Sequence, residues 1–101
     1  EDQQTTLRVL TGGTALVYTS VSVSAFVPSI ARLIILWIDV ELASDDGWLR
    51  PGIPTNDYYY ITGVDNYLEI FHNTAGGSQL AYKTTAGGDV DIAVLGFYEE
   101  L

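Results

Sequence analysis

The most apolar stretch of the chain, residues 31–42, has the sequence ARLIILWIDVEL. As a strand it sends successive side chains to opposite sides of a sheet. One face is then apolar throughout, whereas the other begins apolar and ends with Asp39 and Glu41. A helix of the same length is the alternative, but the Ile and Val content and the lack of a C-terminal glycine favour a strand. The stretch therefore predicts a strand in which both faces begin apolar and one ends acidic.

Shorter segments with the two-residue period of strands lie on both sides of this stretch, separated by clusters of Gly, Pro, Asn and Asp. Besides residues 31–42, we expect strands in residues 7–10, 15–19, 19–27, 48–50, 58–62, 67–72, 79–84 and 90–98. The pair Gly12-Gly13 predicts a hairpin between the first two of these. No segment has the pattern of an amphipathic helix. The sequence thus predicts an all-β fold, an antiparallel β-sandwich of the jelly-roll type with about eight strands.

A chain of 101 residues accommodates one domain, and we assign residues 1–101 to a single β-sandwich with residues 1–6 as a flexible lead-in. Apolar residues at alternating positions predict the core: Val21, Val23, Ile34, Leu36, Ile38, Val40, Leu68, Ile70, Val90, Ile92 and Val94. The chain has no methionine and begins with Glu1. We therefore expect a mature product or an excised piece, such as a C-terminal fragment, of a longer protein.

The chain is strongly acidic, with 13 Asp and Glu against four Lys and Arg and a net charge of −9. Such a chain repels phosphate backbones and anionic lipid, so we expect no nucleic-acid partner. Insertion into a membrane is not expected either, because the apolar runs are far shorter than the roughly 20 residues of a spanning helix. The absence of cysteine excludes disulfides, thiol nucleophiles and cysteine-ligated metal sites.

Two pairs of carboxylates are spaced so that each pair shares one face of a strand: Asp39 with Glu41, and Asp89 with Asp91. Either pair could act as an acid pair, or could bind calcium together with the loop Asp45-Asp46-Gly47. A solvated acidic face is the simpler interpretation. We expect no cofactor and no metal site, with calcium as the alternative.

The single histidine, His72, lies near the end of an expected strand. A catalytic triad would require it to meet a serine and an acid across the fold, which no pattern in the sequence indicates. The common motifs of hydrolases, phosphate-binding loops and metalloproteases are also missing. We therefore expect no catalytic residues and no enzyme.

Aromatic residues are abundant, with seven Tyr, three Phe and two Trp. Tyrosine and tryptophan rings beside carboxamides and carboxylates bind sugars by stacking and hydrogen bonding. The candidate ligand-binding residues are Trp48, Asn56, Asp57, Tyr58, Tyr59 and Tyr60. The alternative is that the three consecutive tyrosines simply alternate between core and surface.

Further apolar residues lie on the second side of the expected sheets, beyond what a small sandwich can bury within itself. These candidates for an oligomer interface are Leu33, Ile35, Trp37, Leu95 and Phe97. Exposed apolar patches of this kind usually contact a partner, and symmetric self-association is the commonest solution. We expect a homo-oligomer.

Three segments carry a resemblance to known proteins. The first is residues 18–28 with the aliphatic strand that follows them. The second is Trp48-Leu49-Arg50-Pro51, and the third consists of residues 79–83 and, further along, 91–97. Together they resemble the small β-sandwich domains of virion proteins in tailed phages and prophages, often C-terminal modules of tail or head fibres. The likeness covers residues 18–98 and rests on strand and turn residues. Pro28, Arg50 and Gly96 correspond to positions that determine the fold.

The resemblance implies a non-enzymatic virion appendage domain, commonly trimeric, that contacts a host-surface glycan or protein. It also implies assembly in the bacterial cytoplasm and a location on the virion surface. Two alternatives remain open. One is a structural domain that decorates a capsid or forms a head fibre, and the other is a carbohydrate-binding module of a secreted hydrolase.

Overall fold

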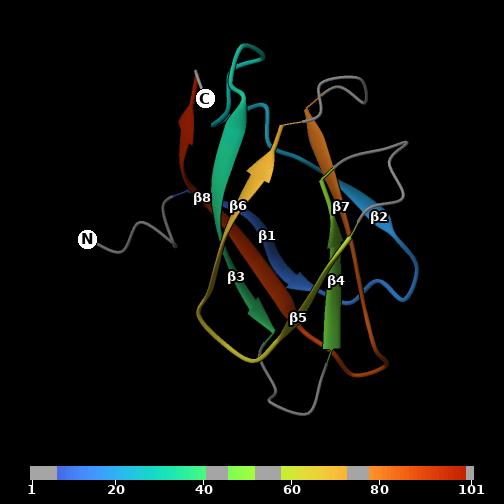
Figure 1. Ribbon diagram of the computed structural model, residues 1–101. Helices are drawn as coiled ribbons and strands as arrows, with labels where there is room; N and C mark the ends of the chain where they lie inside the picture. Colours follow the sequence, from blue (N-terminus) through green and yellow to red (C-terminus); the bar gives the residue numbers. More distant parts are fainter. Residues whose placement is uncertain (1–6, 41–45, 52–57, 73–77, 100–101) are drawn as a thin grey trace.

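The computed structural model describes residues 7–40, 46–51, 58–72 and 78–99 (Figure 1). The strands are β1 (Arg8–Gly13), β2 (Thr19–Ser22), β3 (Leu33–Val40), β4 (Asp46–Arg50), β5 (Tyr59–Thr62), β6 (Asn66–Phe71), β7 (Gln79–Thr84) and β8 (Val90–Tyr98). The strands from β3 to β8 lie within two residues of the ranges that the sequence predicts. Within the described ranges, no helix is long and apolar enough to cross a membrane.

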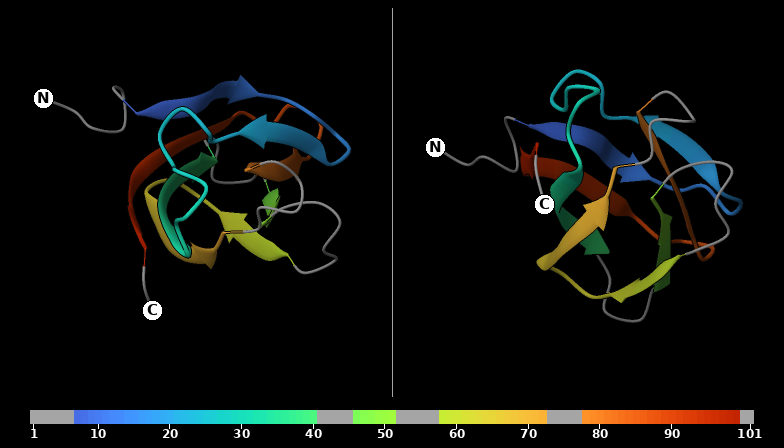
Figure 2. Two further views of the ribbon diagram at one scale, coloured as in Figure 1. Left: turned by 90° about the horizontal axis from the view of Figure 1, so that it is seen from above. Right: turned by 45° about the horizontal axis from the view of Figure 1, so that its top comes forward.

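The strands form two four-stranded antiparallel sheets in the orders β1-β8-β3-β6 and β2-β7-β4-β5, which enclose the core between them (Figure 2). The pairs β1–β8, β2–β7, β3–β6 and β4–β5 are those of one long hairpin with its tip between β4 and β5. Successive pairs of this hairpin lie in opposite sheets. This is the arrangement of a jelly roll, so the predicted fold class is confirmed.

The core lies between the inner faces of the two sheets. The predicted core residues are buried, with the exception of Leu68, which is partly buried and packs against the others. Leu49, Ile61, Leu80 and Tyr82 complete the core from the β2-β7-β4-β5 sheet. Full burial of aliphatic side chains such as these contributes about 1.5 to 3 kcal/mol each.

The N-terminal part of the chain differs from the prediction. β1 continues through Gly12 and Gly13 and pairs with β8, so the expected hairpin between the first two strands is wrong. Gly13 lies so close to the other sheet that a Cβ on it would be 2.6 Å from the hydroxyl oxygen of Tyr82. Gly13 thus permits a close approach of the two sheets, and Gly12 has a φ of +66°, which favours glycine. In the sequence, the two glycines together resemble a turn signal.

β2 is also shorter than expected, because its alternating pattern continues to Val27 while the strand ends at Ser22. The backbone N–H groups of Phe26 and Val27 both donate to the carbonyl of Val23, which marks a turn. Val23 and Val27 are nevertheless buried in the core. The alternating pattern therefore marks which valines are buried. It does not mark where the strand ends.

Candidate functional site

Strand β4 presents alternate side chains to the core and to the outside. Leu49 is buried, so its neighbours Trp48 and Arg50 lie on the outer face of the sheet. Trp48 is in register with Lys83 of β7 on one side and with Tyr60 of β5 on the other. A row of one basic and two aromatic side chains therefore crosses the outer face over three strands.

Tyr60 completes an aromatic pair at one end of this row. Its ring centre is 5.7 Å from that of Trp48, and the ring planes are inclined by 47°. Its hydroxyl donates a hydrogen bond of 2.5 Å to Oδ1 of Asp46. This bond is the main cause that raises the pKa of the Tyr60 hydroxyl above 10.0, and partial desolvation and the charge of Asp46 add to it. Because 58% of Tyr60 is exposed, the pair is accessible from solution.

Tyr18, just before β2, extends the row at its other end. The guanidinium carbon of Arg50 lies 3.8 Å from the centre of the Tyr18 ring. The Nζ atom of Lys83 lies 5.0 Å from the ring centres of both Tyr18 and Trp48. Such cation–π contacts stabilise exposed side chains by about 0.5 to 1 kcal/mol each. We call the set Tyr18, Asp46, Trp48, Arg50, Tyr60 and Lys83 the aromatic–basic face.

The structure separates the predicted ligand-binding residues. Trp48 and Tyr60 come together on the aromatic–basic face, and Tyr58 is exposed just before β5. Tyr59 is partly buried and packs against the core, which is the alternation weighed above as the alternative. Asn56 and Asp57 lie outside the described residues. Tyr18, Arg50 and Lys83 were not among the predicted ligand-binding residues. The sequence signal that could have found two of them is the small number of basic residues, four in 101.

The outer face of the other sheet is mainly apolar. On β3, Leu33 is in register with Phe71 of β6 and Tyr98 of β8, and Trp37 is in register with Tyr67. Ile35 lies between these two rows and is flanked by Glu69 and Gly96. Phe71 is 64% exposed and Tyr98 48% exposed, while Leu33 and Ile35 are partly buried. We call the set Leu33, Ile35, Tyr67, Phe71 and Tyr98 the apolar face.

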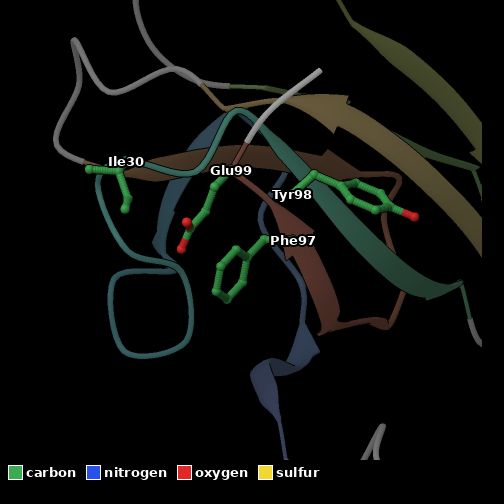
Figure 3. Close-up of a pocket in the computed structure, with 4 residues that line it drawn as sticks. All are labelled: Ile30, Phe97, Tyr98 and Glu99. Carbon is green, nitrogen blue, oxygen red and sulfur yellow. The ribbon is translucent and has the colours of Figure 1, made fainter.

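Two of the predicted interface residues, Leu95 and Phe97, are displaced from this face by a β-bulge. Leu36 pairs with Val94 but Ile35 pairs with Gly96, so Leu95 is the extra residue. The bulge reverses the alternation of β8, and consequently Tyr98, and not Phe97, lies beside Leu33. Figure 3 shows the rings of Phe97 and Tyr98 pointing in different directions. Phe97 instead lines a shallow, open pocket with Ile30, Tyr98 and Glu99.

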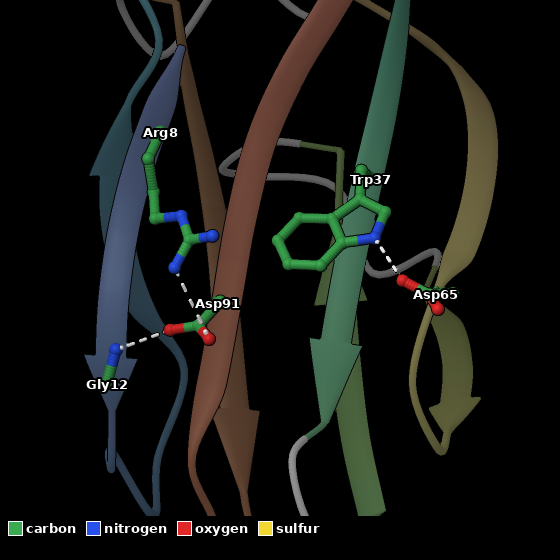
Figure 4. A network of polar contacts seen from close by, with 5 residues as sticks. All are labelled: Arg8, Gly12, Trp37, Asp65 and Asp91. Atoms are coloured by element: carbon green, nitrogen blue, oxygen red, sulfur yellow. Dashed lines mark hydrogen bonds and ion pairs between the residues drawn. The ribbon is translucent and has the colours of Figure 1, made fainter. Parts of the chain in front are cut away.

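Trp37, the third predicted interface residue on β3, is only 5% exposed. Its indole N–H donates a 2.9 Å hydrogen bond to Asp65, and the Arg8 guanidinium lies 5.1 Å above its ring (Figure 4). Asp91 holds Arg8 through an ion pair of 3.5 Å and accepts a hydrogen bond of 2.7 Å from the backbone N–H of Gly12. Trp37 is thus enclosed by its own chain and has little surface for a partner.

The structure describes three of the four carboxylates in the predicted pairs. Asp39 lies opposite Asp91 across β3 and β8, and Asp91 is paired with Arg8. The Oδ1 atom of Asp89 is buried without a hydrogen-bond partner. Glu41 falls outside the described residues. Among the residues that the structure places, no three His, Cys, Asp or Glu side chains are grouped to hold a metal ion.

His72 meets a serine, which the sequence did not indicate. Its Nδ1 lies 2.9 Å from the carbonyl oxygen of Ala31, and its Nε2 lies 3.1 Å from Oγ of Ser78. Because a carbonyl only accepts, Nδ1 carries a proton. A catalytic triad would have a carboxylate at this position. With Ser78 only 7% exposed, the imidazole instead joins the end of β6 to the start of β7 and to the turn before β3.

Comparisons with protein-family models, with curated proteins and with solved structures find no match to this chain.

Proposed function

We propose that this chain is a non-enzymatic appendage domain of a phage virion, a trimeric fibre tip or receptor-binding module displayed on the virion surface. Its aromatic–basic face binds a saccharide of the host surface. The observation that carries the proposal is the exposed pair of Trp48 and Tyr60, with the Asp46 carboxylate beside it. The resemblance of residues 18–98 to phage appendage domains points to the same function.

Such a face fits the chemistry of a sugar ring. The apolar side of a pyranose packs on an indole or phenol ring, and a nearby carboxylate accepts hydrogen bonds from the sugar hydroxyls. The rings lie on an outer sheet face with Tyr60 58% exposed, so each site would bind weakly. Three such sites on one trimer act at high effective concentration and raise the avidity for a cell surface by about 10² to 10⁴ over a single site.

The apolar face supports the trimer. Its side chains are aromatic or aliphatic, with Glu69 as the charged neighbour in the middle row. For a chain of net charge −9, copies repel one another least where a surface carries few carboxylates. A second and a third copy of the chain are therefore the occupants that we assign to this face, in the closed symmetry that is usual for homo-oligomers.

The test is binding of the intact protein to host cells and to a glycan array. Trp48→Ala should lower binding about tenfold per site, since it removes the stacking surface. Val64→Ala, which shortens an exposed apolar side chain in the turn between β5 and β6, outside both faces, is the matched control and should leave array binding unchanged. Equal binding by the parent and Trp48→Ala would exclude this face as the site.

The carbohydrate-binding module of a secreted hydrolase is the second candidate, because an exposed aromatic face suits that function equally well. The two differ in oligomeric state and in what the protein binds. A monomer that binds isolated polysaccharide but not host cells would favour the hydrolase module. An oligomer that stabilises particles and binds neither would favour the structural role in a capsid.

A further inference from the structure

We infer that the saccharide bound at the aromatic–basic face carries an anionic group, a carboxylate or a phosphate, and that Lys83 and Arg50 bind this group. This inference rests on the proposed function and specifies its ligand class. The basic side chains of this acidic chain are unevenly distributed over the fold. The chain has four basic residues and a net charge of −9, yet two of the four lie on adjacent strands of one outer face.

Neither of these two cations forms an ion pair with a residue that the structure describes. The described residues contain one ion pair, between Arg8 and Asp91 on the other sheet. Arg50 and Lys83 have no hydrogen bond to a described residue, and the Nε atom of Arg50 is buried without a partner. In a chain with 13 Asp and Glu residues, two basic side chains that pair with none of the described carboxylates point to a role outside the folded chain.

The aromatic rings hold the two cations in place without reducing their charge. Both lie within 5.0 Å of the centre of the Tyr18 ring, so their positive groups are close enough to repel each other. An anion bound beside that ring would relieve the repulsion and would accept hydrogen bonds from both. A side chain that served only to cover the sheet would not require the second positive charge.

The order of the side chains also gives the site a direction. Along the row, Tyr60 and Asp46 lie on one side of Trp48, and Lys83 lies on the other. A sugar ring stacked on Trp48 would direct its hydroxyls toward Asp46 and its acidic substituent toward Lys83. The strongly negative chain disfavours a densely charged polymer, so the fitting ligand carries isolated charges, such as one uronic or sialic acid or one phosphodiester per repeat.

The experiment uses an array of matched glycans with the intact protein. One arm compares glycans that end in glucuronic or N-acetylneuraminic acid with their methyl esters. The second arm compares glycerol-phosphate-substituted glycans with the dephosphorylated forms. The parent should bind the charged member of a pair about tenfold more tightly at low salt. The arm that shows the difference identifies whether carboxylate or phosphate is the natural group.

Charge variants connect that preference to the face. Lys83→Gln and Arg50→Gln should each remove most of the preference, measured as the ratio of the affinities for the charged and the neutral glycan, and Lys83→Arg should restore it. Arg32→Gln removes the same charge from an exposed turn outside this face and is the matched control. Thermal melting verifies that each variant is folded.

The outcomes separate the inference from the proposed function. Equal binding of charged and neutral glycans, with Trp48→Ala weakening both, would overturn the inference and leave the proposed function intact. A preference for the charged glycan that Arg32→Gln reduces as much as Lys83→Gln would also overturn it, because the effect would then be one of net charge. Failure to bind any glycan would remove the proposed saccharide site and the inference together.

Discussion

The outer faces of the two sheets each carry one tryptophan, and the two residues have contrasting surroundings. Trp37 is almost completely covered, and its indole N–H is bonded to Asp65. Trp48 is partly exposed, and its indole N–H makes no hydrogen bond to a described residue. A tryptophan whose polar group is used within the chain stabilises the fold. One whose ring and N–H remain available is suited to a ligand.

The faces around the two tryptophans differ in the same way. Arg8 beside Trp37 is paired with Asp91, whereas Lys83 beside Trp48 has no acidic partner among the described residues. The apolar side chains Leu33 and Ile35 continue the Trp37 side, and tyrosines continue the Trp48 side. This contrast supports our proposal that one face contacts copies of the chain and the other binds a polar ligand.

The largest expected effect is the loss of self-association in Ile35→Asp. A carboxylate in the middle of the apolar face cannot be buried without a partner, so the trimer should dissociate. Light scattering behind a sizing column should give about 33 kDa for the parent, from three chains of 11.0 kDa, and about 11 kDa for the variant. Ser20→Asp adds the same charge to the exposed outer face of the other sheet and should leave the mass unchanged.

A parent mass of about 11 kDa would contradict the proposed trimer. A folded Ile35→Asp variant that remains a trimer would show that the interface lies elsewhere on the molecule.

The two tryptophans should differ in their effect on stability. Trp37→Ala removes a buried ring and leaves Asp65 without its donor, which should lower the free energy of unfolding by about 3 kcal/mol. Trp48→Ala removes weak contacts with Tyr60 and Lys83 and should cost about 1 kcal/mol or less. Urea unfolding followed by circular dichroism measures both. Equal losses would mean that the aromatic–basic face contributes to stability as much as the Trp37 network.

The bulge at Leu95 permits a finer comparison on neighbouring residues. Tyr98→Ser should weaken self-association several-fold, because Tyr98 lies beside Leu33 on the apolar face. Phe97→Ser should have the smaller effect, because Phe97 is in register with Ile34 and lies off that face. The dilution dependence of the mass, from sedimentation or light scattering, gives the two dissociation constants. The opposite order would favour the regular alternation that the sequence suggests.

The smallest expected effect is on the titration of Tyr60. The bond to Asp46 raises the pKa of Tyr60 in the folded state, so this residue should deprotonate above pH 10.0. The hydrogen bond between Tyr60 and Asp46 contributes fully to stability below the pKa of an unfolded tyrosine. This contribution is lost as the pH rises through the raised pKa of Tyr60 in the folded state. Ultraviolet difference titration of the parent against Tyr60→Phe isolates its signal. In Asp46→Asn the midpoint should move to lower pH, and an unchanged midpoint would contradict the assigned cause.

Local pattern by itself determined most of the strands and nearly all of the core. The alternation in residues 31–42 and 90–98 is a property of neighbouring residues, because the backbone alone sends successive side chains to opposite sides. It predicted the core-facing positions of β3, and those of β8 up to Leu95, but not the burial of Trp37 on the outer face. Trp48 and Tyr60 were identified as aromatic residues that border polar loops, and both face outward because they alternate with the buried Leu49 and Ile61.

The tertiary structure alone decided which strands pair and in which register. β1 pairs with β8 from the far end of the chain, so Gly12 and Gly13 lie within a strand and not in a hairpin turn, and Gly13 permits a close approach between the sheets. One extra residue at Leu95 exchanged the faces of Phe97 and Tyr98, because a shift of one position reverses every later side chain. Spacing along the chain does not encode such pairings.

The same reason explains which site residues the sequence could not bring together. Tyr18, Trp48 and Lys83 come from three separate segments and meet only because β2, β7 and β4 are neighbours in one sheet. The contact of His72 with Ser78 likewise depends on how β6 and β7 are placed in opposite sheets. Local sequence determines which side chains face outward, and the packing of distant strands decides which of them share a surface.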